Sequence, residues 1–325
     1  MRQNINWGII GLGNIALRFA HAFKDSKNST LKGISSNNLE KIKVFQDKFN
    51  INKNYCFDNY EDLLECKDID IVYIALPNSM HKEWILKSIN SKKNILVEKP
   101  AFINLLDVED IKDKIIDDNI FFAEALMYRY SPQVLKVLEL IKDETIGKPV
   151  SMVSNFGVNL LTKKNIFGFN KKKKIDKKNR LYNKELGGGA ILDLGCYPVS
   201  FSILIASIIS KIDYDKFKII EKMRDNGSLD VDINSNLNLE FENGFISEVN
   251  ASFSKNLGTE TVIKGSTGVM RILNPWQADP PTIILEGSIN KEINLKYNND
   301  IYSYEISAIS TVSYTHLTLP TKRIV

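Results

Sequence analysis

Hydrophobic and polar positions in the first part of the chain follow a strand-helix-strand order. Short apolar runs at residues 7–10, 31–35, 70–75 and 95–97 have the length of buried strands. Helical patterns follow the first two runs, one ending at Phe23 and one over residues 38–49. Because strands that alternate with helices form parallel sheets, we predict an α/β domain with a parallel sheet over residues 1–122.

The pattern changes to apolar-polar alternation in the second part of the chain. Alternating runs at residues 236–241, 245–253, 260–264 and 269–273 predict strands. Turn signals at Asn243-Gly244 and Thr267-Gly268 join them as neighbours. We therefore predict a C-terminal α+β domain over residues 123–311, with a mostly antiparallel sheet. Residues 312–325 resemble translated vector sequence, and we expect them to be a non-native tail.

Composition excludes several classes of protein. The 325 residues carry 43 Lys and Arg against 39 Asp and Glu, and a net charge of +4 is too small to indicate a nucleic-acid binder. Three cysteines without C-x-x-C spacing fit a reducing compartment and predict no metal site. The longest apolar stretch, residues 199–209, is shorter than a membrane span, and the N-terminus lacks a signal peptide. We expect a cytoplasmic protein with no membrane segment.

A glycine-rich turn follows the first predicted strand. Gly11 allows the tight turn, Gly13 lets a pyrophosphate approach the backbone, and Asn14 and Ile15 open the helix whose N-terminus would face the phosphates. This arrangement predicts a dinucleotide cofactor. The alternative is that the glycines serve packing alone.

Cofactor choice is expected at the end of the second strand, where a carboxylate would bind a ribose 2′-hydroxyl. The chain has Ser35 and Ser36 there instead. Hydroxyl groups can donate to a 2′-phosphate, so the sequence favours NADP, with NAD as the alternative.

Four ordered motifs resemble one family. They are A-L-P-N-S-M-H at residues 75–81, E-K-P at 98–100, E-A-L-M-Y-R-Y-S-P-Q at 124–133 and G-G-G-A-I-L-D-L-G-C-Y-P-V at 187–199. Together with the glycine-rich turn they resemble the Gfo/Idh/MocA oxidoreductases over residues 5–310. The resemblance implies a Rossmann domain, an NAD(P)-dependent dehydrogenase acting on a sugar or trans-diol, and a homodimer or homotetramer.

The resemblance also implies catalytic roles. Lys99, after Glu98, would lie beside the nicotinamide and bind the reacting hydroxyl, and Asp193 would hold substrate hydroxyls. Tyr197 would transfer the proton, and a nearby ammonium such as that of Lys99 makes a tyrosine a better base. A buried ammonium requires oxygen partners, so an inward Lys99 predicts a carboxylate or substrate oxygen close to it. The alternatives are that Lys99 is a surface lysine, that Asp193 only stabilises the helix dipole, and that Tyr197 is a buried aromatic residue of the core.

Further positions fit the cofactor or substrate less specifically. Pro77, Asn78 and His81 follow a strand at the sheet edge where ligands bind, so we expect them near the cofactor. Tyr128 and Arg129 are expected to border the substrate, by resemblance. His81 as a helix cap and Arg129 as a structural ion pair are the alternatives.

An alternative function would use the same fold to bind a cofactor without catalysing a reaction. A non-catalytic NAD(P)-binding sensor would not need Lys99, Asp193 and Tyr197 together. Because the chain has all three, we expect an enzyme.

Overall fold

The computed structural model describes residues 4–164, 170–173, 175–176, 178–213, 216–227, 229–297 and 299–318. The chain forms two compact units, residues 1–130 with 298–325, and residues 131–297. Each unit is described by itself. Residues 319–325, the last part of the expected non-native tail, lie outside the described residues.

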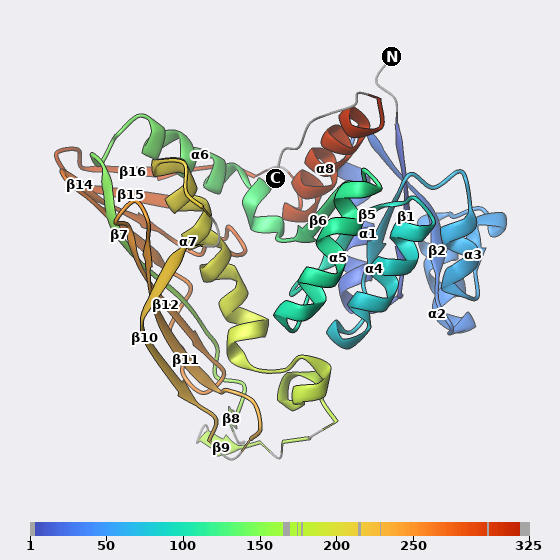
Figure 1. Cartoon of the computed structure of the whole chain (residues 1–325), viewed down its shortest axis with the longest axis horizontal. Coiled ribbons are helices and arrows are strands. Elements are labelled where there is room, and N and C mark those ends of the chain that lie inside the picture. Colours follow the sequence, from blue (N-terminus) through green and yellow to red (C-terminus); the bar gives the residue numbers. More distant parts are fainter. Residues whose placement is uncertain are drawn as a thin grey trace. The chain divides into compact units, whose positions relative to one another are not determined.

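The first unit is built on a six-stranded parallel sheet of order β3-β2-β1-β4-β5-β6. Its strands are β1 (Ile5–Ile10), β2 (Ser29–Ser35), β3 (Cys56–Phe57), β4 (Ile71–Ile74), β5 (Asn94–Glu98) and β6 (Phe122–Ala125). Its helices are α1 (Asn14–Ala22), α2 (Leu39–Phe49), α3 (Tyr60–Glu65), α4 (His81–Asn90), α5 (Leu105–Asp117) and α8 (Ile301–Thr318) (Figure 1). This strand order is that of a Rossmann domain, so the predicted parallel sheet is confirmed.

Several helices of the chain begin at side chains that cap them. The Asn38, Asn59 and Asn104 side chains accept hydrogen bonds from the first-turn amides of α2, α3 and α5. Each such cap contributes about 1 kcal/mol of stability and fixes the residue at which the helix starts.

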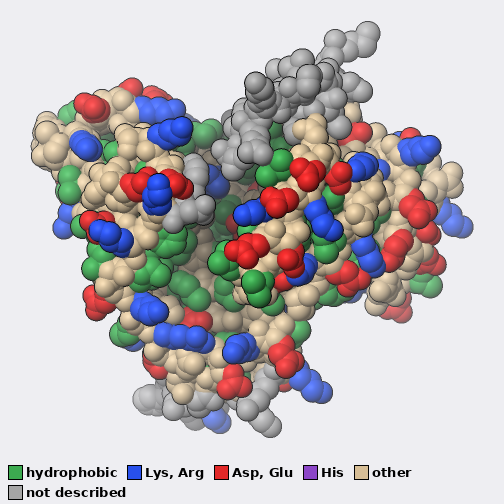
Figure 2. Space-filling view, viewed as in Figure 1, with side chains coloured by type: hydrophobic (Ala, Val, Ile, Leu, Met, Phe, Trp, Pro, Cys, Tyr) green, Lys and Arg blue, Asp and Glu red, His purple; other side chains and the backbone are tan. Residues whose placement is uncertain are grey.

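Helix α8 belongs to the first unit, although it lies near the end of the chain. It packs against α1 and β2, and the Trp7 indole N–H of β1 donates to the Ser310 hydroxyl over 2.8 Å. On the face of this unit seen in Figure 2, acidic and basic side chains are interspersed.

The second unit is an eight-stranded sheet of order β10-β11-β12-β7-β13-β14-β15-β16. Among the described strands of this sheet, only the β12–β7 pair is parallel, so the predicted mostly antiparallel sheet is confirmed. The strands are β7 (Pro149–Gly157), β10 (Phe217–Asp225), β11 (Asn234–Phe241), β12 (Ile246–Ser252), β13 (Thr261–Gly265), β14 (Gly268–Ile272), β15 (Thr282–Gly287) and β16 (Lys291–Asn294), with a separate hairpin of β8 (Thr162–Lys164) and β9 (Asn170–Lys172). Helices α6 (Pro132–Lys142) and α7 (Cys196–Ile209) contact each other, and α7 packs on β7 and β12.

The structure groups two segments differently from the sequence analysis, which ended the first domain at residue 122. Residues 123–130 lie with the first unit because β6 pairs with β5. Residues 301–311 also lie with it, because α8 packs on α1 and β2.

One helical stretch has the length and apolar composition of a membrane span. It covers Lys184–Ile209, and half of its most apolar window is buried inside the protein. Its α7 part packs on the sheet of the second unit, as a core helix does.

Glu305 of α8 is a carboxyl group enclosed in the first unit. It is fully buried, and neither carboxylate oxygen has a hydrogen-bond partner among the described residues. Burial and then the nearby Glu98 raise the pKa of Glu305 well above its usual range. The hydroxyl groups of Tyr73, Tyr130 and Tyr302 lie within the electrostatic reach of Glu305. The folded protein therefore favours the neutral carboxyl.

Replacement of Glu305 by Gln is expected to remove part of the pH dependence of stability. The folded pKa lies above the unfolded value of about 4.3, so Glu305 stabilises the fold fully below that value and loses this contribution as pH rises through the folded pKa. Urea unfolding at about pH 5 and about pH 9 should show a smaller alkaline loss in Glu305→Gln than in the wild type. Equal losses in both proteins would contradict the assignment.

Candidate active site

The glycine-rich turn lies between β1 and α1. Gly11 has φ +90°, and a Cβ there would lie 2.7 Å from Leu76 Cδ2 and 2.8 Å from the Ala75 carbonyl oxygen. A side chain at residue 11 is therefore strained and obstructed. Gly13 caps α1 without a side-chain hydrogen bond, and a Cβ there would meet nothing within 4 Å. The open space over Gly13 fits a pyrophosphate at the helix N-terminus, beside Asn14 and Ile15, the first residues of α1.

A Gly13→Ala variant separates cofactor binding from folding. Since the protein leaves room for the methyl group, stability should fall by less than about 1 kcal/mol, the scale of a helix-cap substitution. The methyl group would occupy the phosphate space, so the Kd for NADPH should rise at least about tenfold. Fluorescence titration and thermal unfolding measure the two effects. Unchanged NADPH affinity would show that the cofactor does not approach Gly13.

The end of β2 carries the two serines expected at the ribose. Ser35 is fully buried, and its hydroxyl donates to the Asn59 carbonyl oxygen over 2.6 Å. The Ser36 oxygen accepts from the Asn38 amide at 3.2 Å, which leaves the Ser36 O–H able to donate. Of the two hydroxyls, only that of Ser36 could reach a ligand without breaking a hydrogen bond that the structure contains.

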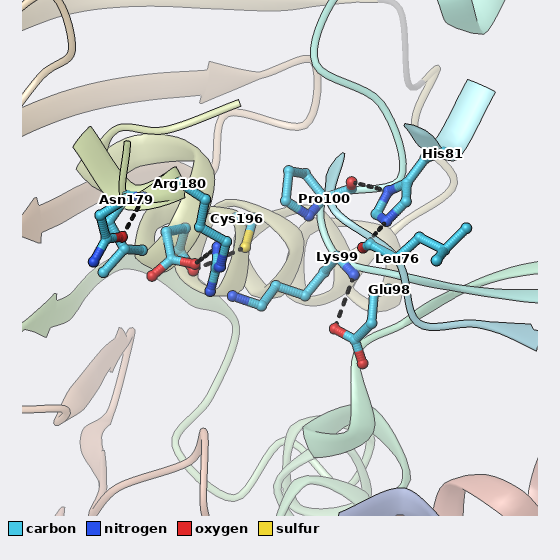
Figure 3. A network of polar contacts seen from close by, with 10 residues as sticks. Leu76, His81, Glu98, Lys99, Pro100, Asn179, Arg180 and Cys196 are labelled. Carbon is cyan, nitrogen blue, oxygen red and sulfur yellow. Dashed lines mark hydrogen bonds and ion pairs between the residues drawn. The ribbon is translucent and has the colours of Figure 1, made fainter. Parts of the chain in front are cut away.

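The loop after β4 contains the next group of predicted residues. Pro77 precedes the short 3₁₀ turn Asn78–Met80, and Asn78 is buried. His81, the first residue of α4, is fully buried, and its ring nitrogens lie 2.9 Å from the carbonyl oxygens of Leu76 and Pro100 (Figure 3). Burial lowers the pKa of His81. The ring thus links the loop after β4 to the loop after β5, and both nitrogens face the protein backbone.

Lys99 follows the last residue of β5, and its side chain is half-buried. The Lys99 amide lies 3.3 Å from Glu98 Oε2 (Figure 3). Glu98 Oε1 accepts a hydrogen bond from the Tyr73 hydroxyl. The Lys99–Pro100 peptide is cis. The Glu98 carboxylate therefore contacts Tyr73 of β4 and the backbone amide that directly follows β5.

Tyr128 and Arg129 occupy a 3₁₀ turn, Met127–Tyr130, after β6. Tyr128 is fully buried, whereas Arg129 is exposed. Of this pair, Arg129 has the accessible polar group that a ligand could use.

Asp193 lies in a π-helical turn, Ile191–Gly195, that leads directly into α7. Asp193 and Tyr197 are four residues apart, a spacing that would put them on one face of a regular α-helix. A π turn has more residues per turn, so the spacing is altered here. The Arg180 Nη1 atom lies 3.0 Å from Asp193 Oδ1, and the Asp193 side chain is 11% exposed against 49% for Arg180. The sulfur atom of Cys196 lies 3.7 Å from the Asp193 carbonyl oxygen (Figure 3).

The start of this helix is held by Asp232. Its carboxylate accepts from the Ile191 amide at 2.8 Å and the Ser235 hydroxyl at 2.7 Å. Gly189 has φ +118°, and a Cβ there would lie 2.4 Å from Asp232 Oδ1. Glycine is needed at residue 189 because the Asp232 carboxylate, which binds the start of the helix, occupies the space that a Cβ would take.

Tyr197 lies in the first turn of α7 and is almost fully buried. Its ring packs at 5.4 Å from Phe156 and 5.8 Å from Trp276, measured between ring centroids. This aromatic packing restricts the direction of the hydroxyl.

Arg180 was missed by the sequence analysis. It precedes the glycine-rich motif by several residues, so only the fold brings it to Asp193. Among the described residues, no group of three His, Cys, Asp or Glu side chains could hold a metal ion.

Two family models match the chain. The GFO/IDH/MocA model described as an oxidoreductase family with an NAD-binding Rossmann fold covers residues 5–120, and the GFO/IDH/MocA C-terminal domain covers residues 134–271. Together they span more than half of the chain.

Curated relatives and solved structures are similar over most of the chain. Trans-1,2-dihydrobenzene-1,2-diol dehydrogenase of Xenopus tropicalis is 28% identical over 88% of this chain and 80% of its own length. D-xylose 1-dehydrogenase (NADP(+)) 2 of Haloferax volcanii is 27% identical over 76% of this chain and 69% of its own. The aldose-aldose oxidoreductase of Caulobacter crescentus, solved with glycerol, has a TM-score of 0.80 at 18% identity, covering 96% and 90% of the two chains. A 3-ketoreductase from Actinomadura kijaniata, solved with NADP and TDP-benzene, has a TM-score of 0.78 at 21% identity, covering 97% and 91%. The two structures support the fold.

Proposed function

The chain belongs to the GFO/IDH/MocA family of NAD(P)-dependent oxidoreductases, and on this premise we propose that it transfers hydride between NADP and a CH–OH group of a sugar or a trans-diol. The substrate class follows the names of its relatives, which act on dihydrodiols and on xylose. The observation that carries the proposal is the start of α7, where Asp193 and Tyr197 are held by Arg180, Asp232 and an aromatic cluster.

Each residue has a distinct role in the proposal. Asp193 accepts hydrogen bonds from substrate hydroxyls, and the Arg180 contact fixes which way its carboxylate points. Tyr197 removes the proton of the reacting hydroxyl, and the Lys99 ammonium binds the oxygen as it loses that proton. A bound NADP would supply the hydride acceptor, which is C4 of its nicotinamide ring.

The cofactor would be held by the first unit. Gly11 and Gly13 leave space for the pyrophosphate, and the Pro77–Asn78 turn and Glu98 would lie along the nicotinamide end. The Ser36 hydroxyl would donate a hydrogen bond to the 2′-phosphate of NADP. Cytoplasmic location, which the cysteine pattern favours, is part of the same proposal. So is assembly into a homodimer or homotetramer, which rests on resemblance.

Turnover with a panel of substrates tests the proposal. Purified protein should reduce NADP, and NAD more slowly, with an aldose or a trans-diol, and reduced-nicotinamide fluorescence would report the rate. Binding of NADPH without turnover on any aldose, sugar phosphate or diol would instead support the non-catalytic sensor.

A further inference from the structure

The π-helical turn that contains Asp193 is fixed at its first residues. The Asp193 amide donates to the Gly189 carbonyl oxygen over 3.0 Å. The Ala190 amide donates to the Asp232 carbonyl oxygen over 2.9 Å, and the Ile191 amide donates to Asp232 Oδ2 over 2.8 Å. The backbone that carries Asp193 is therefore held by its own turn and by one residue outside it.

The loop that carries Arg180 is bonded to the same place. The Gly189 amide donates over 3.1 Å to the carbonyl oxygen of Leu181, the residue directly after Arg180. A Cβ on Gly188 would lie 2.5 Å from the Arg180 carbonyl oxygen and 2.7 Å from that of Leu181. Gly189 thus bonds through its amide to the Arg180 loop and through its carbonyl oxygen to the Asp193 amide, so it connects the two sides of the Arg180–Asp193 ion pair.

Asp232 is a buried residue just before β11 that contacts this junction with both carboxylate oxygens. Its exposed fraction is 4%. Oδ2 accepts from the Ser235 hydroxyl as well as from the Ile191 amide, and Oδ1 occupies the space that a Cβ on Gly189 would take. A buried carboxylate requires hydrogen-bond donors, and the N-terminus of a helix favours a negative charge. The Asp232 carboxylate is therefore suited to fix the backbone around Gly189.

We propose that Asp232 is a positioning residue, whose carboxylate fixes the backbone from which Arg180 and Asp193 reach each other. Asp232 itself does not touch the substrate. The geometric part of the inference stands on contacts within the second unit. Its consequence for substrate binding rests on the proposed function, in which Asp193 accepts hydrogen bonds from substrate hydroxyls.

The alternative is that Asp232 only stabilises the start of the helix. Such a role would lower the temperature of unfolding when Asp232 is replaced. It would not change the reactivity of Arg180 or the KM for substrate in the protein that remains folded. These two quantities, measured at a temperature where each variant is folded, therefore separate positioning from stabilisation.

Labelling of Arg180 with phenylglyoxal tests the geometry without requiring turnover. The rate, read on the Arg180 peptide by mass spectrometry, should be slow while the guanidinium is held by Asp193. Asp193→Asn removes the charged partner and gives the rate of an unheld guanidinium. Asp232→Ala should raise the rate at least about threefold, the scale of one weakened hydrogen bond. A rate equal to that of the wild type would overturn the proposal.

A conservative variant and a matched control accompany this measurement. In Asp232→Asn the amide oxygen can still accept from the Ile191 amide, so the labelling rate should stay within about twofold of the wild type, since Asn and Asp cap helices equally well. Asp300 Oδ1 accepts from the Tyr302 amide at the start of α8 over 3.0 Å, and Asp300→Ala should leave the Arg180 rate unchanged. An Asn variant as reactive as the Ala variant would contradict a positional role.

A second variant covers the case in which Asp232→Ala does not fold. Asp232→Glu keeps the negative charge but moves the carboxylate by one methylene group, so its oxygens no longer match the Ile191 amide. The labelling rate of Arg180 should again rise above that of the wild type. A folded Glu variant with the wild-type rate and the wild-type KM would overturn the proposal.

Kinetics then distinguish this inference from the proposed function. In Asp232→Ala the KM for the aldose or trans-diol should rise about tenfold, the scale of one hydrogen bond to a charged group, while the Kd for NADPH stays constant. Faster labelling in a protein without turnover would support the positioning of the ion pair and contradict the proposed function. Turnover with an unchanged KM and an unchanged labelling rate would overturn the inference and leave the function.

Discussion

Replacing Tyr197 by Phe is expected to lower kcat by about 10²-fold to 10⁴-fold, the contribution of a positioned general acid or base. The Phe ring keeps the contacts with Phe156 and Trp276, so the fold around α7 should persist. Only the hydroxyl that moves the proton is lost. The Kd for NADPH should not change, because the proposed contacts to the cofactor's phosphates come from the glycine-rich turn and not from the Tyr197 hydroxyl.

Steady-state rates for the wild type and Tyr197→Phe measure this effect. Tyr55→Phe provides a control, since the Tyr55 hydroxyl donates to the exposed Asp68 and has no role in the proposed site. The control should retain wild-type kcat. Loss of less than about threefold in Tyr197→Phe would rule out Tyr197 as the proton-transfer group.

Replacing Trp276 by Ala is expected to lower the free energy of unfolding by about 3–5 kcal/mol, the usual cost of deleting a buried aromatic ring. Trp276 is fully buried and contacts Phe156, Tyr197 and Phe201, with ring centroids 5.8–6.1 Å apart. Its indole N–H donates to the Asn155 carbonyl oxygen over 3.0 Å. The deletion would also leave the Tyr197 ring without one of its packing partners.

Urea unfolding of Trp276→Ala, compared with Trp276→Phe, tests this account. The Phe variant keeps most of the ring contacts and should lose less stability than the Ala variant. A folded Trp276→Ala protein should also show reduced kcat, because the Tyr197 hydroxyl is less well directed. A loss of stability below about 1 kcal/mol would show that Trp276 is not a core residue of this unit.

Much of the fold was predictable because the order of apolar, polar and glycine residues along the chain determines the strands and turns locally. Buried strands such as β1 and β4 are apolar runs, and the turn between β1 and α1 requires Gly11 for its positive φ. Strand β10 was not predicted, since all of its residues are exposed and no apolar-polar alternation marks it. The place of α8 was also missed, because a helix pattern does not say which sheet the helix covers.

Some residues of the candidate site were predictable from the sequence and others were not. Lys99, Asp193 and Tyr197 stand in recognisable motifs, so the sequence indicated them. Arg180 did not stand out, because its contact with Asp193 depends on how the loops fold.

Transfer of deuterium tests the central claim most directly. A substrate deuterated at the carbon that bears the hydroxyl, an aldose at C1 or a trans-diol, would be incubated with the protein and oxidised NADP. Mass spectrometry of the nicotinamide should find one deuterium in the reduced cofactor with the wild type, and almost none with Tyr197→Phe. Cofactor that binds but gains no deuterium from any aldose or trans-diol would contradict the assignment of this chain as a hydride-transferring enzyme of that class.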